Sequence, residues 1–365
     1  MGLLKRILLG GAAGVVVGGF ATGAVLSCQL LVSPEQFYDS KGITSLVTYP
    51  SVAAAPTQLF GAGDYLFYVE GTGIYRIPKA GGTDPSLVRS FANKLTSIAF
   101  DGEQTIAYCA DGALAAFQYD TLAPVTLAAG AGCSVLAIDG QILAYVGPNG
   151  DLPDAARPST TVADRSSGAS QTLTEDGGGA VPIAISVFAK STYVLEGMHL
   201  FVTVGGQSPN LCDYAKVGLG GGLPCADPKV VLLIDAGAQP VSLVMRGEGC
   251  DLKRVELPDP VPPDYCCPAP TLQAPRCTAT YPLPQGDPTG TGDFASYGGY
   301  FYWSQAGNIQ RVAAVNVAPN VVTVPQTVVS ISGGNITALS VDDTNVYFVG
   351  GNQILRAPLP PPPND

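Results

Sequence analysis

Few residues of this sequence have side chains that commonly do chemistry in enzymes. The chain of 365 residues contains one histidine, His199. A catalytic triad that needs a second histidine, and a metal site built on two histidines, are therefore excluded. No Gly-x-Ser-x-Gly motif is present, so the sequence does not indicate a serine hydrolase. His199 lies in the aliphatic run MHLFVTV, where we expect it to be an ordinary strand residue.

Acidic residues recur in one kind of turn. Asp101, Asp139, Asp342 and Asp343 each follow a short aliphatic run. Together such carboxylates could hold a divalent ion such as Ca²⁺. Alternatively, each side chain accepts hydrogen bonds from nearby backbone N–H groups and starts a hairpin turn. The repetition favours the turn role, and we predict no catalytic residue, no metal ligand and no cofactor.

Arginine and aromatic residues recur as well. Arg76, Arg254, Arg311 and Arg356 could form a ring that binds an anion, but we expect them to bind turn carbonyls or acids in the next repeat unit. The recurring aromatic residues could form a platform that stacks on sugars, or could pack between neighbouring units. They are Tyr68, Tyr108, Tyr145, Tyr302, Trp303, Tyr347 and Phe348.

The cysteines indicate disulfide bonds rather than a metal or redox centre. Eight follow Cys28, and none has the Cys-x-x-Cys spacing; they are Cys109, Cys133, Cys212, Cys225, Cys250, Cys266, Cys267 and Cys277. An even number is what an oxidising compartment favours. We predict that the nearest neighbours pair, Cys109 with Cys133 and Cys212 with Cys225, and that the last four pair among themselves.

The N-terminus has the pattern of an export signal. Lys5 and Arg6 precede an uncharged run over 7–26. The residues VLSC (25–28) resemble a bacterial lipobox, although Leu26 departs from the small residue preferred there. The resemblance implies cleavage after residue 27 and attachment of lipid to Cys28. Two alternatives are an uncleaved membrane helix and simple secretion. We assign 1–27 to the signal peptide and 28–42 to a linker.

Three segments reveal an internal repeat: GDYLFYVEGTGIYRIP (63–78), GGYFYWSQAGNIQRVA (298–313) and TNVYFVGGNQILRAP (344–358). Each contains an aromatic strand, a glycine-bearing turn and a second strand with an arginine. An aliphatic strand and an Asp turn precede the aromatic strand, and a looser strand follows. Four short strands in about 40–45 residues are typical of one blade of a β-propeller.

The repeat therefore predicts an all-β chain with a β-propeller over residues 43–359. Aligning the aromatic positions favours seven blades, with six as the alternative. The segment ITSLVTYP (43–50) is predicted to close the ring by pairing with the last blade, which avoids an exposed sheet edge. Residues 360–365 form a proline-rich tail.

The aromatic segments YFYW (300–303) and VYFVGG (346–351) resemble propellers of the YWTD and NHL types and the propeller lipoproteins of bacteria. The full YWTD tetrapeptide is absent, so the resemblance implies a fold and no site residues.

Three loop insertions are predicted, at 147–180, 205–228 and 247–293. The last one holds four cysteines, and ten prolines lie within 258–288. Proline donates no hydrogen bond to a sheet, so we expect an extended loop held by disulfides. Long ordered loops on a rigid scaffold are where binding sites usually occur.

The composition and net charge of the chain exclude further classes of function. Hydrophobic residues make up 46% of the chain and charged residues 13%, which suits a real core, and the net charge of −11 argues against nucleic-acid binding. We expect a lipid-anchored propeller of the bacterial cell envelope, at the outer membrane or in the periplasm, or else a secreted one. It would bind protein or glycan without catalysis, as a binding or scaffold module. The alternative is a propeller enzyme of the lactonase, lyase or glycosidase type, with a metal ion or a carboxylate pair in its channel.

Overall fold

The regular structure of this chain is almost entirely β-strand. The computed structural model describes residues 42–93, 95–127, 132–148, 158–173, 182–188, 191–196, 199–204, 210–213, 224–234, 240–248, 252–256, 291–305, 307–313, 325–331 and 335–361. The chain divides into two units, Met1–Gln36 and Phe37–Asp365, and all described residues belong to the second.

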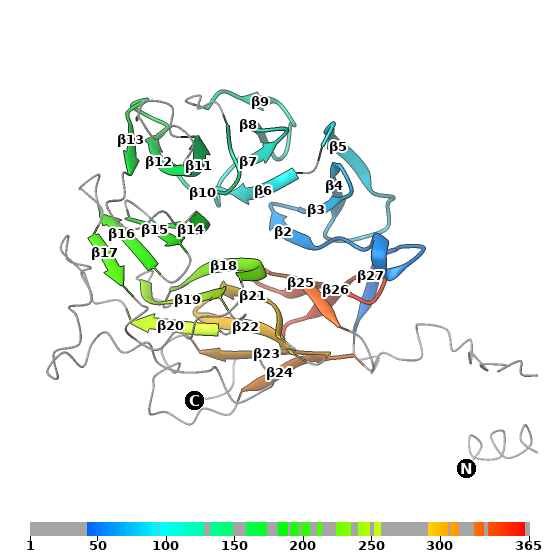
Figure 1. Cartoon of the computed structure of the whole chain (residues 1–365). Coiled ribbons are helices and arrows are strands. Elements are labelled where there is room, and N and C mark those ends of the chain that lie inside the picture. The colour runs from blue at the N-terminus through cyan, green and yellow to red at the C-terminus, as the bar shows by residue number, and fades with distance from the viewer. Residues whose placement is uncertain are drawn as a thin grey trace, which may run out of the picture. The chain divides into compact units, whose positions relative to one another are not determined.

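The first half of the described strands forms antiparallel four-stranded sheets in chain order (Figure 1). Sheet A contains β2 (Gln58–Ala62), β3 (Tyr65–Glu70), β4 (Gly73–Pro78) and β5 (Ser86–Ser90). Sheet B contains β6 (Leu95–Phe100), β7 (Thr105–Ala110), β8 (Ala113–Gln118) and β9 (Pro124–Val125). Sheet C contains β10 (Leu136–Asp139), β11 (Ile142–Pro148), β12 (Pro158–Asp164) and β13 (Ser170–Leu173). Sheet D contains β14 (Pro182–Phe188), β15 (Ser191–Glu196), β16 (His199–Val204) and β17 (Asn210–Asp213).

The second half continues the pattern with one exception. Sheet E contains β18 (Pro224–Ile234), β19 (Pro240–Glu248) and β20 (Leu252–Glu256), and has three strands in the described part. Sheet F contains β21 (Thr291–Tyr297), β22 (Tyr300–Gln305), β23 (Asn308–Ala313) and β24 (Gln326–Ser330). Sheet G contains β25 (Ile336–Val341), β26 (Asn345–Gly350) and β27 (Gln353–Pro358), with β1 (Thr44–Thr48) as its fourth strand.

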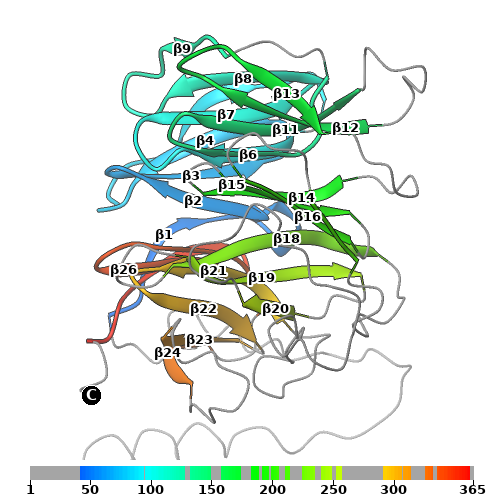
Figure 2. The same cartoon turned by 90° about the vertical axis from the view of Figure 1, so that its left-hand side faces the viewer.

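The first strand of the fold therefore completes the last sheet. β1 pairs antiparallel with β27, from Thr44 opposite Arg356 to Thr48 opposite Gln353. The Nε2 of Gln353 donates to the hydroxyl of Thr48 over 3.1 Å. The predicted strand and its pairing with the last unit are confirmed for Thr44–Thr48, and Figure 2 shows β1 in a view turned by 90° from Figure 1.

The first strands of the sheets lie next to one another near the middle of Figure 1, and the fourth strands lie at its rim. β2 contacts β25, β6 contacts β10, β10 contacts β14, β14 contacts β18, and β21 contacts both β18 and β25. Sheets A and B share a buried cluster that includes Phe67, Ile74, Ile106 and Phe117. Each sheet thus packs against the next one along the chain, and sheet G packs against sheet A.

Both faces of sheet A are buried, because its strands alternate between its two neighbours. Tyr68 packs with Ala338 and Val349 of sheet G. Phe67, the residue before it, packs with Phe117 of sheet B instead. Short strands whose apolar side chains point alternately to the two faces can therefore pack against a neighbouring sheet on each side.

The β7–β8 hairpin shows how the Asp-Gly turns work locally. Asp111 and Gly112 have φ angles of 53° and 74°, so both residues adopt the left-handed conformation that tight hairpins require. The carboxylate of Asp111 also accepts the backbone N–H groups of Ala92 and Asn93, which lie in the connection from β5 to β6.

The predicted insertions are partly wrong. The range 147–180 contains β12 and β13, the range 205–228 contains β17 and the start of β18, and the range 247–293 contains β20 and the start of β21. β12 and β13 carry Ser, Thr and Gln side chains, and this polar composition had indicated a loop. In β13 the described residues are exposed to water, whereas Ser159 and Thr160 of β12 are buried, so a polar composition did not mean an exposed loop there. The rest of each range lies outside the described residues.

Removing β1 should destabilise the fold. A chain that begins at residue 49 loses the fourth strand of sheet G and exposes the β27 edge, whereas a chain that begins at residue 42 keeps it. Single substitutions typically cost about 0.5–3 kcal/mol, so loss of a whole strand should lower the free energy of unfolding by about 3 kcal/mol or more and promote aggregation. Chemical denaturation and gel filtration of the two chains make the comparison. Equal stability would show that β1 is dispensable.

Candidate functional site

Asp101 begins the turn between β6 and β7, and its carboxylate is fully engaged there. One oxygen, Oδ1, accepts the backbone N–H groups of Glu103, Gln104 and Thr105 over 2.8–2.9 Å. The other, Oδ2, forms an ion pair with Arg165 over 3.0 Å. Asp101 is buried. The turn-starting role predicted for this residue is therefore confirmed.

Arg165 connects this turn to the next sheet. It directly follows β12 of sheet C and also donates to the carbonyl of Gly140 and to the hydroxyl of Thr105. Burial alone would raise the pKa of Asp101, but the N–H groups of Thr105 and Glu103 and the Arg165 guanidinium outweigh it and hold this pKa below its ordinary value. The pair fastens sheet B to sheet C.

Asp342 repeats this arrangement between sheets G and A. Its Oδ1 accepts the N–H groups of Thr344 and Asn345, and its Oδ2 lies 3.0 Å from both Lys79 Nζ and the Tyr347 hydroxyl, which donates to it. Lys79 directly follows β4, just as Arg165 directly follows β12. Burial opposes ionisation, but the Thr344 N–H and Lys79 outweigh it and lower the pKa of Asp342.

Sequence reasoning missed these two ion pairs. The signal that could have found them is a basic residue one position after the third strand of a unit, together with an Asp after the first strand of the preceding unit. The other two acids of the predicted set are placed differently. Asp139 ends β10, and Asp343 accepts a hydrogen bond from the hydroxyl of Tyr297 over 2.7 Å.

The recurring arginines bind the neighbouring sheet, as predicted. Arg76 donates to the carbonyls of Tyr119 and Asp120 in sheet B. Arg356 donates to those of Lys79 and Ala80, which follow β4 in sheet A. Each guanidinium thus reaches the segment just after the third strand of the next sheet. We call these contacts arginine bridges.

Arg311 makes the same kind of bridge from sheet F to sheet G, where it donates to the carbonyls of Pro360 and Pro361 over 2.7–2.9 Å. Its guanidinium also lies 4.7 Å from the ring centre of Tyr300, as that of Arg76 lies 4.4 Å from the ring centre of Tyr65. The side chain of Arg254, in β20, lies outside the described residues. These described arginines therefore do not form an anion-binding ring: Arg76, Arg311 and Arg356.

Polar side chains on the first strands also link neighbouring sheets. The first strand of each sheet is an edge whose outward N–H groups need acceptors. Ser97 of sheet B accepts the N–H of Leu136 in sheet C. Asp293 of sheet F accepts that of Leu339 in sheet G over 2.8 Å. Ser340 of sheet G accepts that of Gly61 in sheet A.

The aromatic residues do not form a sugar-stacking platform, because most of them are buried. The buried members are Tyr68, Tyr145, Tyr302, Trp303, Tyr347 and Phe348, each at most 7% exposed. Tyr108 is partly exposed and packs beside Phe91. Packing between sheets, the alternative for this set, is confirmed for five of them: Tyr68, Tyr145, Tyr302, Tyr347 and Phe348.

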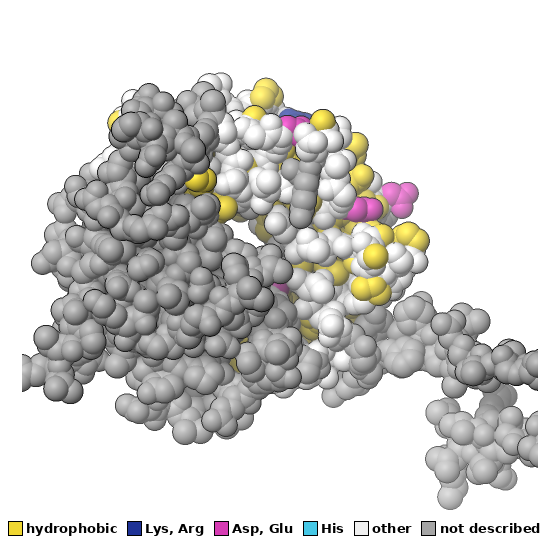
Figure 3. All heavy atoms as spheres, in the orientation of Figure 1, with side chains coloured by type: hydrophobic (Ala, Val, Ile, Leu, Met, Phe, Trp, Pro, Cys, Tyr) yellow, Lys and Arg dark blue, Asp and Glu magenta, His cyan; other side chains and the backbone are white. Residues whose placement is uncertain are grey.

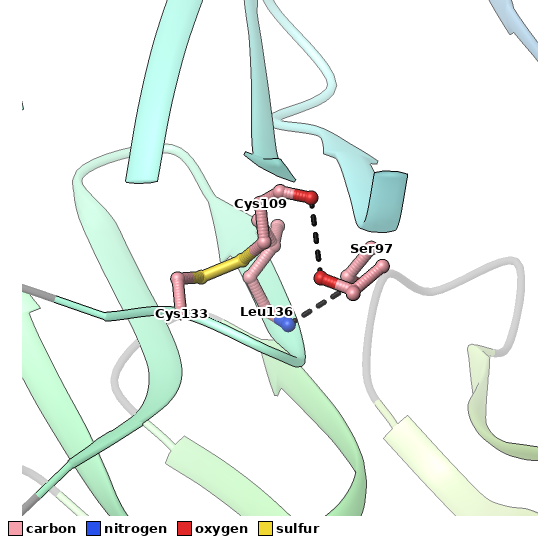
Figure 4. The surroundings of a disulfide bond; sticks show 5 residues. Ser97, Cys109, Cys133 and Leu136 are labelled. Atoms are coloured by element: carbon pink, nitrogen blue, oxygen red, sulfur yellow. Dashed lines mark hydrogen bonds between the residues drawn. A yellow bond between two sulfur atoms is a disulfide. The ribbon is translucent and has the colours of Figure 1, made fainter. Parts of the chain in front are cut away.

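A disulfide bond joins Cys109 to Cys133, as predicted (Figure 4). Cys109 lies in β7 of sheet B, and Cys133 lies in the segment that leads into β10 of sheet C. Their Cα atoms are 5.3 Å apart, which is within the usual range. Both residues are buried, so the bond is a structural link between two sheets.

The remaining predicted residues are placed only in part. Cys212 lies in β17, Cys225 in β18 and His199 in β16, but their side chains lie outside the described residues. Five other cysteines lie entirely outside the described residues: Cys28, Cys250, Cys266, Cys267 and Cys277.

The described residues hold no group of three or more His, Cys, Asp or Glu side chains arranged to bind a metal ion. In the same part of the chain, no helix is both long enough and apolar enough to cross a membrane. On the face seen in Figure 3, the described surface is mostly backbone and uncharged side chains, with scattered hydrophobic groups and few charges.

Neither a protein-family model nor a curated protein matches this sequence. Solved structures do match. A catalytically inactive variant of virginiamycin B lyase from Staphylococcus aureus, in complex with quinupristin, superposes with a TM-score of 0.56 at 10% identity, over 87% of this chain and 99% of that one. The WD40 β-propeller domain of Doa1 gives 0.55 at 8% identity, over 88% and 97%.

A third structure is the extracellular domain of a putative hybrid two-component system, BT4673, from B. thetaiotaomicron. It gives a TM-score of 0.54 at 10% identity, over 87% of this chain and 39% of that one. At these identities the similarity concerns the fold alone. This chain therefore has a β-propeller fold, which other proteins use both for catalysis and for binding.

Replacing Asp101 by Ala should cost about 3 kcal/mol at neutral pH, because it leaves Arg165 and three backbone N–H groups without their acceptor. The pKa of Asp101 is depressed in the fold, so its contribution is present above the unfolded value of about 4 and is lost as the pH falls through the folded value. Urea unfolding from pH 7 to pH 2 should show the gap between wild type and variant closing at acid pH.

Asp64→Ala is the matched control, since Asp64 lies exposed in the corresponding turn of sheet A. It should change stability by no more than about 0.5 kcal/mol. An Asp101 variant as stable as this control would show that the turn carboxylate does not fasten the two sheets.

Proposed function

We propose that this chain is an extracytoplasmic β-propeller, anchored to a membrane by lipid on Cys28, that serves as a non-catalytic binding or scaffold module for protein or glycan. The observation that carries the proposal is the buried Cys109–Cys133 bond between sheets B and C. Disulfides form and persist in oxidising compartments and are rare in the cytosol.

Within this proposal the propeller has seven blades, sheets A to G, and β1 closes the ring. Support comes from the order of contacts, in which each sheet packs against its successor and β25 of sheet G packs against β2 of sheet A. Pairing of β1 with β27 ties the two ends of the fold together in one sheet. A ring closed in this way leaves no first-to-last gap through which sheets could separate.

A non-catalytic role is supported by what the candidate residues do. Asp101 and Asp342 hold turns and cations of adjacent sheets, and Arg76, Arg311 and Arg356 hold backbone carbonyls. A catalytic acid or base has to face a substrate, and these groups face neighbouring sheets instead. The alternative, a propeller enzyme, would have to place its chemistry elsewhere in the chain.

The anchor rests on the sequence VLSC at 25–28 and on the compartment that the disulfide indicates. A bacterial lipoprotein carries two or more acyl chains, which is what stable membrane attachment requires. One of the similar structures is an extracellular domain, which supports the same side of the membrane.

The test is to express the full chain and Cys28→Ala in a bacterial host that exports it, and to analyse both by mass spectrometry and membrane fractionation. Wild type should lose residues 1–27, carry lipid on Cys28 and sediment with membranes, whereas Cys28→Ala should carry no lipid and keep residues 1–27. Both should show Cys109 linked to Cys133. Wild type that is membrane-bound with its N-terminus intact and no lipid would identify an uncleaved helix instead. Free thiols at both Cys109 and Cys133 in the exported chain would contradict the assigned compartment.

A further inference from the structure

One arginine bridge holds a segment that belongs to no strand pair. β27 is the third strand of sheet G, and the fourth strand of that sheet is β1, from the other end of the fold. The segment after β27, through Leu359 to Pro361, therefore does not lead into a strand of sheet G. In sheets A and B, by contrast, the segments that accept arginine bridges continue into β5 and β9. The prolines after Leu359 can thus leave the arginine without pulling a strand out of its sheet.

The guanidinium of Arg311 binds two consecutive proline carbonyls of this segment. Its Nη2 donates to the carbonyl of Pro360 over 2.9 Å and to that of Pro361 over 2.7 Å. Its Nε donates to Oε1 of Gln326 over 2.8 Å. Arg311 is only 3% exposed. Without the two carbonyls, Nη2 of a buried guanidinium would lose its acceptors, which favours a site that stays occupied.

Aromatic and aliphatic side chains lie at the same junction of sheets F and G. The ring centre of Tyr300 is 4.7 Å from the guanidinium of Arg311, and Tyr300 is partly exposed. Tyr300, Tyr297 and Leu359 all pack against the buried cluster that these two sheets share. The N–H of Leu359 donates to the carbonyl of Thr344 over 2.8 Å, which fixes where the prolines begin. A buried donor and partly exposed aromatic side chains are therefore present where the prolines lie.

Consecutive prolines suit such a site for two reasons. A proline residue has no N–H group, so a run of prolines offers only carbonyl acceptors to a donor such as a guanidinium. The fixed φ angle of proline also favours the polyproline II conformation before binding, so little conformational entropy is lost. Grooves that bind proline-rich segments in other proteins are lined by aromatic side chains for the same reasons.

We propose that the junction around Arg311 and Tyr300 is a binding site for a proline-rich segment of a partner protein, and that the chain's own residues 360–361 fill it until the partner displaces them. These two residues show that the site has room for a proline backbone. The inference rests on the proposed binding role, which it narrows to a protein partner with consecutive prolines.

The position of Leu359 favours a partner protein over a second copy of this chain. Leu359 is bound in sheet G, and Pro361 lies two residues after it, a span of about 7 Å at most. While Leu359 stays in place, these prolines are too close to their own sheet to reach the Arg311 of another copy. A segment that displaces them in solution has to come from a different chain.

The test is an NMR titration with the peptide PPPPND, the sequence of residues 360–365. The protein is the full chain, or a chain that ends at Leu359, with labelled tyrosine rings. The peptide should shift the resonance that is missing in Tyr300→Leu and saturate the shortened chain in the millimolar range. The full chain should bind it at least tenfold more weakly, because its tethered prolines compete at a high effective concentration.

A second peptide and a second protein test the role of proline itself. The peptide AAAAND has the same length and charge, and it should bind the shortened chain at least tenfold more weakly than PPPPND. The full-length double variant Pro360→Gly, Pro361→Gly keeps the length of the chain. It should bind PPPPND more tightly than the unchanged full chain does, because glycine loses more conformational freedom on binding and competes less well.

Arg311→Met and Arg76→Met, each in the shortened chain, are the matched variants, because each removes one arginine bridge and only Arg311 binds the prolines. Arg311→Met should weaken PPPPND at least tenfold, and Arg76→Met should leave its binding unchanged. Equal binding by these two variants, equal binding of the two peptides, or no binding by the shortened chain and the glycine variant would overturn the site.

Gel filtration tests the second copy. The full chain and the shortened chain should elute as the same species, whereas dimers formed by the full chain alone would assign the prolines to a second copy and contradict a separate partner. None of these measurements involves the lipid on Cys28. Failure of the proline site and failure of the anchor are therefore told apart.

Discussion

The fold depends on one constraint: each sheet packs against two neighbours and presents its first strand as an inner edge, so it is stable only between them. Apolar side chains fill the junctions, as Tyr68 does toward sheet G and Phe67 toward sheet B. Leaving polar groups at the junctions unpaired is unfavourable, because an unsatisfied buried donor or charge costs more than a typical contact contributes. The side chains that could have done chemistry are used to meet that demand, through Ser97, Asp293 and the turn aspartates.

Different junctions between sheets are held together by different residues. Arginine bridges lead from sheet F to G, from G to A and from A to B, each from the same register position of the third strand. In sheet B that position is Ala116, opposite Ala107, and cannot bridge. There the disulfide and the Asp101–Arg165 pair link sheet B to sheet C instead. The cross-link thus lies where the repeated contact is missing.

Much of this architecture could be predicted from the sequence, because strands, tight turns and the arginine position recur and repetition is visible without a structure. The closing strand β1 was predicted by its isolation before the first unit, and the Cys109–Cys133 bond by proximity. β12 and β13 were missed because outer strands can be polar and then have the composition of loops. The ion pairs were missed because their members are far apart in the sequence. Lys79 lies more than 60 residues from Asp342, and so does Arg165 from Asp101, so that only the order of the sheets brings them together.

The recurring polar residues hold the sheets together. The most direct measurement is the free energy of unfolding of Arg76→Met, Arg311→Met and Arg356→Met, which keep the apolar stem and remove the guanidinium. Hydrogen bonds from charged groups contribute about 1.5–3 kcal/mol, so each variant should lose about 2 kcal/mol. If all three unfold with the free energy of the wild type, the arginines do not bridge the sheets and the account is wrong.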